Sequence, residues 1–398
     1  QRQMCIRDRC FRDAQRADQG QWGRGWRRGH RLGPCTGCVV AVRDGKGPSE
    51  KVMGRVSRVP LRVVIPIGVA LLVVMMIVSV GTGPVGLGVG AIMRVIVHEV
   101  LGVGQPQPQL ETTVVMTLRL PRVLFGVLVG AALAVSGASL QSLLRNPLAG
   151  PGIIGVSGGA SMGAVAAIVL LPSLSGIAVA WVVPAAAFLG GLLVTSVIYA
   201  LARPRAGSGT ARLLLVGIAI GSAAAAVTGF LTYAADDDEL QTVVFWQMGS
   251  LGHLDWIKLA VAAPVIIGCC IVLTLLARHL DLLSLGDRQA RHLGLDVART
   301  RKIVIAMTAL LTGTSVAFTG TIGFIGLVVP HLARLLCGPP HRRVLPVSAV
   351  LGALLIVFAD TLSRTIAPPD EVPIGLFTAA LGAPFFLIVV LRTKEAQS

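Results

Sequence analysis

Long uncharged stretches fill the chain from about residue 60 onward, and short polar gaps separate them. They are residues 63–93, 123–144, 146–202, 213–235, 259–277, 303–333, 344–359 and 372–391. A membrane-spanning helix needs about 20 mainly apolar residues. The run 146–202 is therefore long enough for two spans, with a break around Pro172–Gly176. Three glycines, from Gly320 to Gly326, divide the run 303–333 into a span and a shorter returning helix.

This pattern predicts an all-α, polytopic membrane protein with ten transmembrane helices. The predicted spans are residues 61–80, 120–143, 153–171, 180–201, 211–233, 257–277, 303–319, 323–337, 344–363 and 372–391. The composition points the same way, because 54% of the 398 residues are hydrophobic, 14% are charged and the mean hydropathy is +0.77. A soluble domain of ordinary composition is excluded.

The net charge of +16 could indicate a nucleic-acid-binding protein, but the placement of the basic residues indicates membrane topology instead. An even number of spans puts both termini on one side of the membrane. If that side is the cytoplasm, most loop arginines lie inside, as the positive-inside rule requires. The outer side then keeps only Arg94, Arg119, Arg122, Lys258 and Arg364. We therefore expect a multi-pass protein of the cytoplasmic membrane, in contact with lipid, with both termini cytoplasmic and no nucleic-acid partner.

Residues 1–52 differ from the rest of the chain. They are rich in Arg, Gly and Gln and show neither helical nor strand periodicity. We expect a disordered leader or a gene-prediction artefact, because Met53 precedes a basic stretch and the first apolar run, and residues 53–398 as the ten-span domain. Cys35 and Cys38 have the spacing of half a zinc site, but the only other leader cysteines, Cys5 and Cys10, lie outside the usual ligand spacing, so no metal site is expected.

Three stretches are more specific than apolar spans. The first is Arg119-Leu-Pro-Arg122, followed by a span and an Asn146-Pro147 turn. The second is FWQMGSLGHLDW at residues 245–256, and the third extends from residue 285 through GTIGFIGLVVPHLARLL to VPIGLFTAALGAPFFLIVVL. In order and spacing, over about residues 60–393, they closely resemble the permease subunit of type II ABC importers, the family that carries cobalamin, haem and ferric siderophores.

The resemblance implies the type II permease fold, with ten spans per subunit. It also implies a homodimer or pseudo-dimer with a central path, two cytoplasmic ATPase subunits and an extracytoplasmic binding protein. The sequence contains no G-x-x-x-x-G-K-[ST] phosphate loop. We therefore expect no enzymatic activity and no cofactor in this chain, with ATP and Mg²⁺ bound by the partner ATPase.

The charged segment 285–301 predicts a short helix off the membrane. Ser284 could cap it, with Asp287 three residues on, and Gly294 could end it. Its basic residues could serve only as cytoplasmic anchors, whereas the resemblance favours a coupling helix that inserts into the ATPase. The coupling residues would be Leu285, Gly286, Asp287, Arg288, Arg291, His292, Leu293, Gly294 and Leu295.

Arg119, Arg122 and Arg364 fall at the outer ends of predicted spans, where topology does not require basic residues. They could extend to lipid headgroups, and Arg364 could form an i,i+4 ion pair with Asp360. They could instead receive carboxylates of a binding protein as charge-assisted pairs, as arginines at the matching positions do in the resembling family. We expect the three arginines to dock the binding protein and Asp360 to form a structural ion pair.

The fifth predicted span is poor in bulky side chains. Gly217, Gly221, Ser222 and Gly229 could serve close packing within one bundle, or they could line a translocation path or a dimer seam. Between spans five and six, at the predicted outer mouth, lie Trp246, Met248 and His253. The membrane interface explains aromatic residues there regardless of substrate, and a contact of Met248 or His253 with haem iron is the alternative.

The expected function is that of a permease subunit in an ATP-driven importer of an iron chelate, either a ferric siderophore or haem. A path of small and apolar residues suits a shielded chelate better than a bare ion, and cobalamin is the alternative cargo. An ion-coupled secondary transporter would need ionisable groups near the midplane, and the sequence supplies almost none. A membrane enzyme would need a nucleophile–base pair or an H-E-x-x-H motif, and neither is evident.

Overall fold

The computed structural model describes residues 60–83, 86, 88–105, 107–171, 177–202, 209–368 and 370–395. All described residues belong to one compact unit, Ser57–Ser398. The predicted leader 1–52 with its cysteines, and the predicted break at Pro172–Gly176, lie outside the described residues.

The described part of the chain is all-α. Its elements are α2 (Leu61–Gly81), α3 (Val89–Leu101), α4 (Gln109–Thr113), η2 (Val114–Arg119), α5 (Leu120–Leu143), η3 (Pro151–Ile154), α6 (Val156–Leu170), α7 (Ile177–Leu201), α8 (Gly209–Tyr233), α9 (Asp237–Met248), α10 (Trp256–Leu275), α11 (Ala277–Ser284), α12 (Asp287–His292), α13 (Val297–Thr319), α14 (Ile325–Cys337), α15 (His341–Thr365) and α16 (Ile374–Glu395).

Among the described residues, 7 helices are long and apolar enough to cross a membrane. They are Leu61–Gly81, Gln109–Leu143, Ala180–Leu201, Arg212–Tyr233, Trp256–Leu275, Val297–Thr319 and His341–Thr365. Shorter apolar helices occupy Val156–Leu170, Ile325–Cys337 and Ile374–Ile388. Each of these helices overlaps one predicted span, so the all-α membrane fold is confirmed, while the count of ten crossings stays a prediction.

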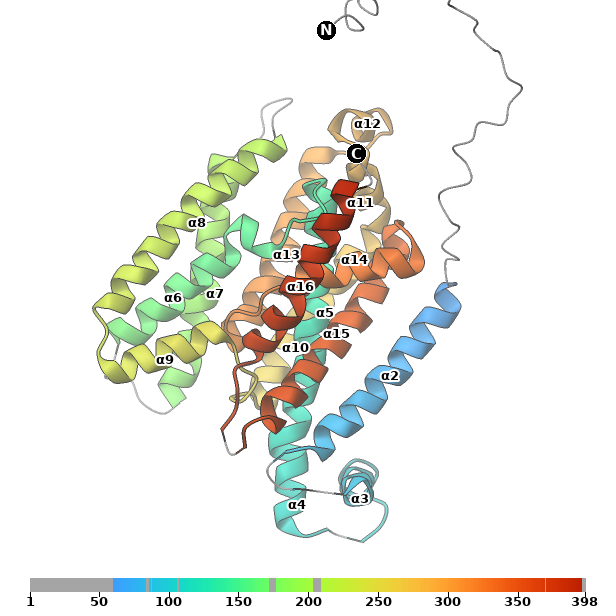
Figure 1. Ribbon diagram of the computed structural model, residues 1–398, viewed down its shortest axis with the longest axis vertical. Helices are drawn as coiled ribbons and strands as arrows, with labels where there is room; N and C mark the ends of the chain where they lie inside the picture. Colours follow the sequence, from blue (N-terminus) through green and yellow to red (C-terminus); the bar gives the residue numbers. More distant parts are fainter. Residues whose placement is uncertain are drawn as a thin grey trace, which may run out of the picture. The chain divides into compact units, whose positions relative to one another are not determined.

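Helix α5 lies at the centre of the helical bundle. It contacts α10, α13, α14 and α15 (Figure 1). In the most apolar window of the helix Gln109–Leu143, 78% of the residues are buried, against 11% for α2, which packs on α15 at the periphery. The group α6, α7, α8 and α9 lies on the side of α5 away from α2 (Figure 1).

Glycines allow the backbones of α5 and its neighbours to touch. A Cβ atom on Gly130 would collide with the carbonyl oxygen of Gly352 in α15, and one on Gly137 would collide with the backbone of Gly326 in α14. Side chains at these positions would force the helices apart, so small residues set the interhelical distance.

Several elements lie outside every predicted span, among them α3, α4, η2 and α9. Helix α3 comes first. The next three elements, α4, η2 and α5, form one continuous helix, which begins at Gln109, 11 residues before the predicted start of the span at residue 120. Helix α9 begins with a capping box, in which Asp236 and Glu239 satisfy each other's backbone N–H groups, and it ends before Gly249 at φ 76°. The acidic stretch 236–239 thus forms the start of a helix.

Candidate functional site

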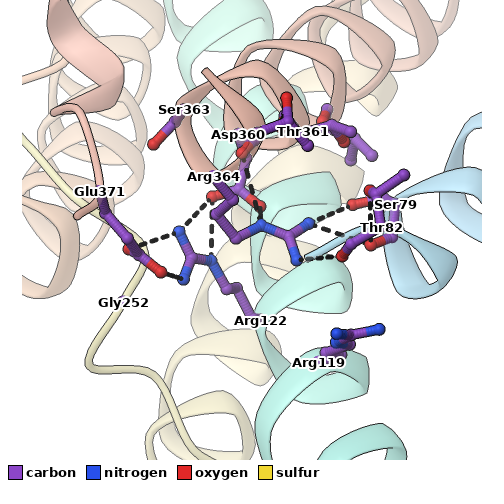
Figure 2. A network of polar contacts seen from close by, with 12 residues as sticks. Ser79, Thr82, Arg119, Arg122, Gly252, Asp360, Thr361, Ser363, Arg364 and Glu371 are labelled. Atoms are coloured by element: carbon purple, nitrogen blue, oxygen red, sulfur yellow. Dashed lines mark hydrogen bonds and ion pairs between the residues drawn. The ribbon is translucent and has the colours of Figure 1, made fainter. Parts of the chain in front are cut away.

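Arg122 lies at the centre of a buried polar network formed by α5, α15 and the segment before α16. Its Nε and Nη2 atoms donate to Asp360 Oδ1 at 2.9 and 2.8 Å. Its Nη1 and Nη2 atoms donate to the two carboxylate oxygens of Glu371 at 2.7 and 3.0 Å. Figure 2 shows the guanidinium held between the two carboxylates. We call Arg119, Arg122, Asp360, Arg364 and Glu371 the arginine network.

Arg364 connects the same carboxylate to the last turn of α2. Its Nε lies 3.1 Å from Asp360 Oδ2, and its Nη2 donates to Ser79 Oγ at 2.7 Å (Figure 2). Arg364 also donates to the carbonyl oxygens of Ser79 and Thr82, at 3.1 and 3.2 Å. The last carbonyls of a helix have no intrahelical donor and carry partial negative charge. The guanidinium therefore both pairs with Asp360 and caps α2.

Arg119 approaches the same helix end from the π-helical turn η2. Its Nη1 donates to the carbonyl oxygen of Val80 at 2.7 Å. The side chains of Arg122 and Arg364 balance those of Asp360 and Glu371 in formal charge, while Arg119 adds a third cation at the α2 carbonyls. Removing one partner from such a buried arrangement would leave an uncompensated charge, which typically costs about 3–5 kcal/mol.

The three arginines predicted from the sequence do come together, but they are buried. Arg119, Arg122 and Arg364 are 5%, 7% and 5% exposed. The predicted i,i+4 pair between Arg364 and Asp360 is present. The helix that carries Arg119 and Arg122 continues beyond the predicted span to Gln109, and the position of these arginines at the end of a span stays a prediction.

Glu371 was not among the predicted residues. Its side chain is 42% exposed and covers the buried guanidinium of Arg122. Two hydrogen bonds hold its segment to the end of α15, from Val372 N–H to the Ser363 carbonyl at 3.1 Å and from Ser363 Oγ to the Val372 carbonyl at 2.5 Å. Burial raises the pKa of Glu371, but the hydrogen bonds and charge of Arg122 outweigh it, so the pKa lies below its ordinary value. In the sequence, only its position beside Asp370, directly before the last predicted span, could have indicated a functional role for Glu371.

The predicted coupling segment lies at the end of the bundle opposite α3 and α4 (Figure 1). Within it lies one short helix, α12 (Asp287–His292), followed by the start of α13 at Val297, and α11 (Ala277–Ser284) lies just before it. Ser284 does not cap α12: it ends α11, its Oγ donates to the Asp281 carbonyl at 2.6 Å, and Gly286 stands at the N-cap position with φ 111°. The predicted cap is therefore wrong, since a turn at Gly286 separates the two helices.

The prediction that Gly294 ends the helix is confirmed. Gly294 has φ 83°, its N–H donates to the Arg291 carbonyl, and the Leu295 N–H donates to the Ala290 carbonyl. At the other end of α12, Asp287 accepts from Arg301 Nη2 at 2.9 and 3.1 Å. The short helix is thus fixed to α13 by an ion pair.

Ala290 and Leu295, the latter a predicted coupling residue, are buried in the core, while other side chains of this segment are exposed. Leu285 and Leu293 are 58% and 61% exposed, and Arg288, Arg291 and His292 are exposed beside them. Apolar side chains on a polar helix at the end of a bundle are typical of a contact surface for another protein.

The small residues of α8 lie in two environments, one packed inside the bundle and one open to the surroundings. A Cβ atom on Gly217 would collide with the carbonyl oxygen of Ile153, so this glycine serves packing within the bundle. No atom lies within 4 Å of the corresponding position at Gly221 or Gly229, and Ser222 is exposed. A groove of about 440 Å³ lies beside them. Its lining residues are Gly158, Ser161, Ala225, Thr228, Gly229, Thr232 and Gln247.

Two of the three residues predicted at the outer mouth share a cavity. Trp246 and His253 line a space of about 810 Å³ between α6, α7, α9, α10 and α13, together with the acidic N-terminus of α9. Lys258 lies at its wall and donates to the His253 carbonyl at 2.5 Å. Met248 does not line this cavity, because it ends α9 with its carbonyl against Gly375.

The chain is similar to several transport proteins over most of its length. It is 46% identical over 284 residues to the hemin transport system permease protein HmuU of Yersinia pestis, which covers 71% of this chain and 84% of that protein. It is 44% identical over 291 residues to the cobalamin import system permease protein BtuC of Halobacterium salinarum, with 73% and 76% covered. It is 42% identical over 281 residues to the Fe(3+) dicitrate transport system permease protein FecD of Escherichia coli, with 71% and 86% covered.

The fold agrees with these relatives. A solved structure of a metal-chelate type ABC transporter in an inward-facing conformation matches with a TM-score of 0.72 at 32% identity, over 83% of this chain and 99% of that one. The protein is thus a multi-pass protein of the cytoplasmic membrane, and it is not an enzyme by itself, because the ATPase of such an importer is a partner subunit. The FecCD transport family matches residues 71–392, so the chain belongs to this family of ABC importer permeases for iron chelates, haem or cobalamin.

Proposed function

We propose that this chain is the permease subunit of an importer that translocates an iron chelate, either a ferric siderophore or haem. The observation that carries this proposal is the groove beside α8, whose lining has hydroxyl, amide and small side chains but no charged one. A bare ferric ion would need protein ligands to replace its hydration shell. A chelate brings its own ligands and needs only a neutral wall. Cobalamin, also a shielded metal complex, is the alternative cargo.

The working unit is a homodimer with its path between two copies of α8. On this helix Gly221, Ser222 and Gly229 are open to the surroundings, and Leu215 and Phe230 are 68% and 73% exposed. A second copy would cover this surface and place two neutral grooves opposite each other. Gly217, which packs inside one subunit, belongs to the wall behind the path.

Two ATPase subunits bind at the α12 end of the bundle. Leu285 and Leu293 enter a cleft on the ATPase, and Arg288 and Arg291 surround them with positive charge. The ion pair between Asp287 and Arg301 transmits movement of α12 to α13. ATP and Mg²⁺ are bound by the ATPase, and this chain carries no cofactor. In this arrangement the α12 end and both termini are cytoplasmic.

The substrate-binding protein docks at the opposite end, over the arginine network. Because Arg122 is buried beneath Glu371, an incoming carboxylate reaches it by taking the place of Glu371. The exchange conserves charge, since one carboxylate replaces another. Arg119 and Arg364 hold α2 against the network while this happens.

Reconstituted transport tests the proposal. The permease, its ATPase and its binding protein are placed in liposomes, and uptake of haem, a ferric siderophore and cobalamin is measured with and without ATP. We expect ATP-dependent uptake of one iron chelate that ionophores do not abolish. Uptake of cobalamin alone would contradict the chelate assignment, and uptake that follows an ion gradient without ATP would contradict the whole proposal.

A further inference from the structure

Three polar side chains from three elements meet at the α12 end of the bundle. Asp281 belongs to α11, His341 is the first residue of α15, and Ser142 lies in the last turn of α5. Asp281 Oδ1 lies 2.5 Å from His341 Nδ1, and His341 Nε2 is hydrogen-bonded to Ser142 Oγ. An ionised Asp281 accepts the Nδ1 proton, which leaves Nε2 of a neutral ring to accept the serine hydroxyl.

Two of the three residues are protected from solvent, whereas the side chain of Asp281 is 38% exposed. His341 and Ser142 are 5% and 6% exposed. Asp281 Oδ1 also accepts the backbone N–H of His341 at 3.0 Å, so one carboxylate holds both the side chain and the first turn of α15. Side-chain bonds of this kind fix the relative positions of three helices.

A serine, a histidine and an aspartate in hydrogen-bonded order are also the arrangement of a serine hydrolase. The surroundings do not support hydrolysis. Ser142 Oγ is buried and lies 3.2 Å from the Ala138 carbonyl, an acceptor of its own helix. None of the three residues lines either cavity described above.

The cluster lies between the coupling segment and the central helix pair. Helix α11 leads directly into α12 through the turn at Gly286, against which the guanidinium of Arg145 packs. Helices α5 and α15 touch along their lengths, with Gly130 against Gly352. At their other end, Arg122 of α5 is bonded to Asp360 of α15. The pair is therefore tied at both ends by polar side chains and between them by close backbone packing.

We propose that Asp281, His341 and Ser142 are positioning residues that join α11, which leads into the coupling segment, to the α5–α15 pair, so that movement passes between the arginine network and the ATPase along these two helices. The inference rests on the proposed function, because it assumes an ATPase at α12 and a binding protein at the arginine network. The inference assigns the transmission of movement to the Asp281–His341–Ser142 cluster, which we call the joint and which is separate from both docking surfaces.

Two substitutions of His341 separate the two halves of the joint. His341→Asn keeps a polar nitrogen near the Nδ1 position, within reach of Asp281, and loses the contact with Ser142. His341→Gln places an amide oxygen near the Nε2 position, where it can accept from Ser142, and loses Asp281. His279→Gln is the matched control, because His279 also belongs to α11 and its Nδ1 has no hydrogen-bond partner among the described residues.

The test uses the complete importer in liposomes and measures ATPase activity with and without the binding protein. We expect His341→Gln to reduce the stimulation by the binding protein about fivefold or more, the size of a typical allosteric coupling. His341→Asn should retain more of the stimulation than His341→Gln, and His279→Gln should retain all of it. Asp281→Asn should add little to His341→Gln, since both break the same contact.

A cross-link separates failure of the joint from failure of the proposed function. Gln289→Cys, on the exposed side of α12, is cross-linked to the ATPase in each variant. A cross-link with full stimulation in His341→Gln would overturn the joint and leave the proposed function intact. Equal loss of basal and stimulated activity, with a lower unfolding temperature, would also overturn it, because that is a purely structural effect. No cross-link in the chain that carries Gln289→Cys and keeps His341 would overturn the assignment of α12 to the ATPase.

Discussion

Arg122 uses its guanidinium for two carboxylates that differ in their surroundings. Asp360 is 1% exposed and shared with Arg364, whereas the side chain of Glu371 is 42% exposed and pairs with Arg122 at the surface. The buried pair is the structural one, because losing either partner would leave a charge away from water. The half-exposed pair is screened by solvent and contributes less, so it is the one that can exchange.

Glu371→Gln tests this exchange. The substitution keeps the shape of the side chain but removes the charge that competes for Arg122, so the binding protein should bind more tightly, with a Kd lower by up to about fivefold. The measurement is surface plasmon resonance with the permease in nanodiscs at neutral pH. At that pH Glu371 is ionised, because its pKa is lowered, and its pairing is lost only as the pH falls through that lowered value.

Asp370→Asn is the control for this measurement. Asp370 is the neighbouring exposed acid and forms no ion pair with another described residue, so its loss should leave the Kd unchanged. Weaker binding by Glu371→Gln would mean that Glu371 itself contacts the binding protein, and the exchange would then be rejected.

At the scale of elements, the contact between α5 and α15 determines how the arginine network and the Asp281–His341–Ser142 cluster are spaced. The two helices meet without side chains between them at Gly130 and Gly352. A glycine inside a helix is costly for the helix itself, so its presence here follows from the approach of the second backbone. The spans were predictable from hydrophobicity, but which glycine faces which helix was not.

Gly130→Ala should therefore reduce the free energy of unfolding by about 1–3 kcal/mol, because the added methyl group overlaps the backbone of Gly352. Gly268→Ala, in α10, is the matched control. No atom lies within 4 Å of its Cβ position, and alanine favours a helix, so its stability should be equal or slightly higher. Equilibrium unfolding in mixed detergent micelles measures both, and identical curves would show that α5 and α15 can separate freely.

At the scale of the whole molecule, charged groups gather at two opposite ends and the spans between them are nearly free of charge. The α12 end carries exposed arginines, and the opposite end carries a buried, nearly balanced network. From this distribution we expect the two proposed partner proteins to bind on opposite sides of the membrane. It also gives the orientation a direct test.

Labelling with a membrane-impermeant maleimide checks the orientation. In a chain whose own cysteines are replaced, Gln289→Cys in α12 should react in inverted vesicles and not in intact cells. Asp237→Cys, at the exposed start of α9, should show the opposite pattern. Reaction of both from the same side would contradict the topology.

The sequence by itself determined the membrane-spanning helices, the turn at Asn146 and the helix end at Gly294. These features depend on local properties, namely the length of an apolar run, an Asn side chain that accepts the Leu148 N–H, and a glycine at positive φ. It also placed Asp360 four residues before Arg364, within reach on one helix face.

Only the tertiary structure decided what the arginines contact. Arg122 meets carboxylates 238 and 249 residues away in sequence, and Arg364 meets carbonyls of α2 that are 282 and 285 residues away. The same holds for Ser142 and His341, which are 199 residues apart. Such partners depend on how the helices are arranged around α5. Hydrophobic periodicity fixes where each helix lies along the chain, but it carries no information on which neighbour each helix packs against.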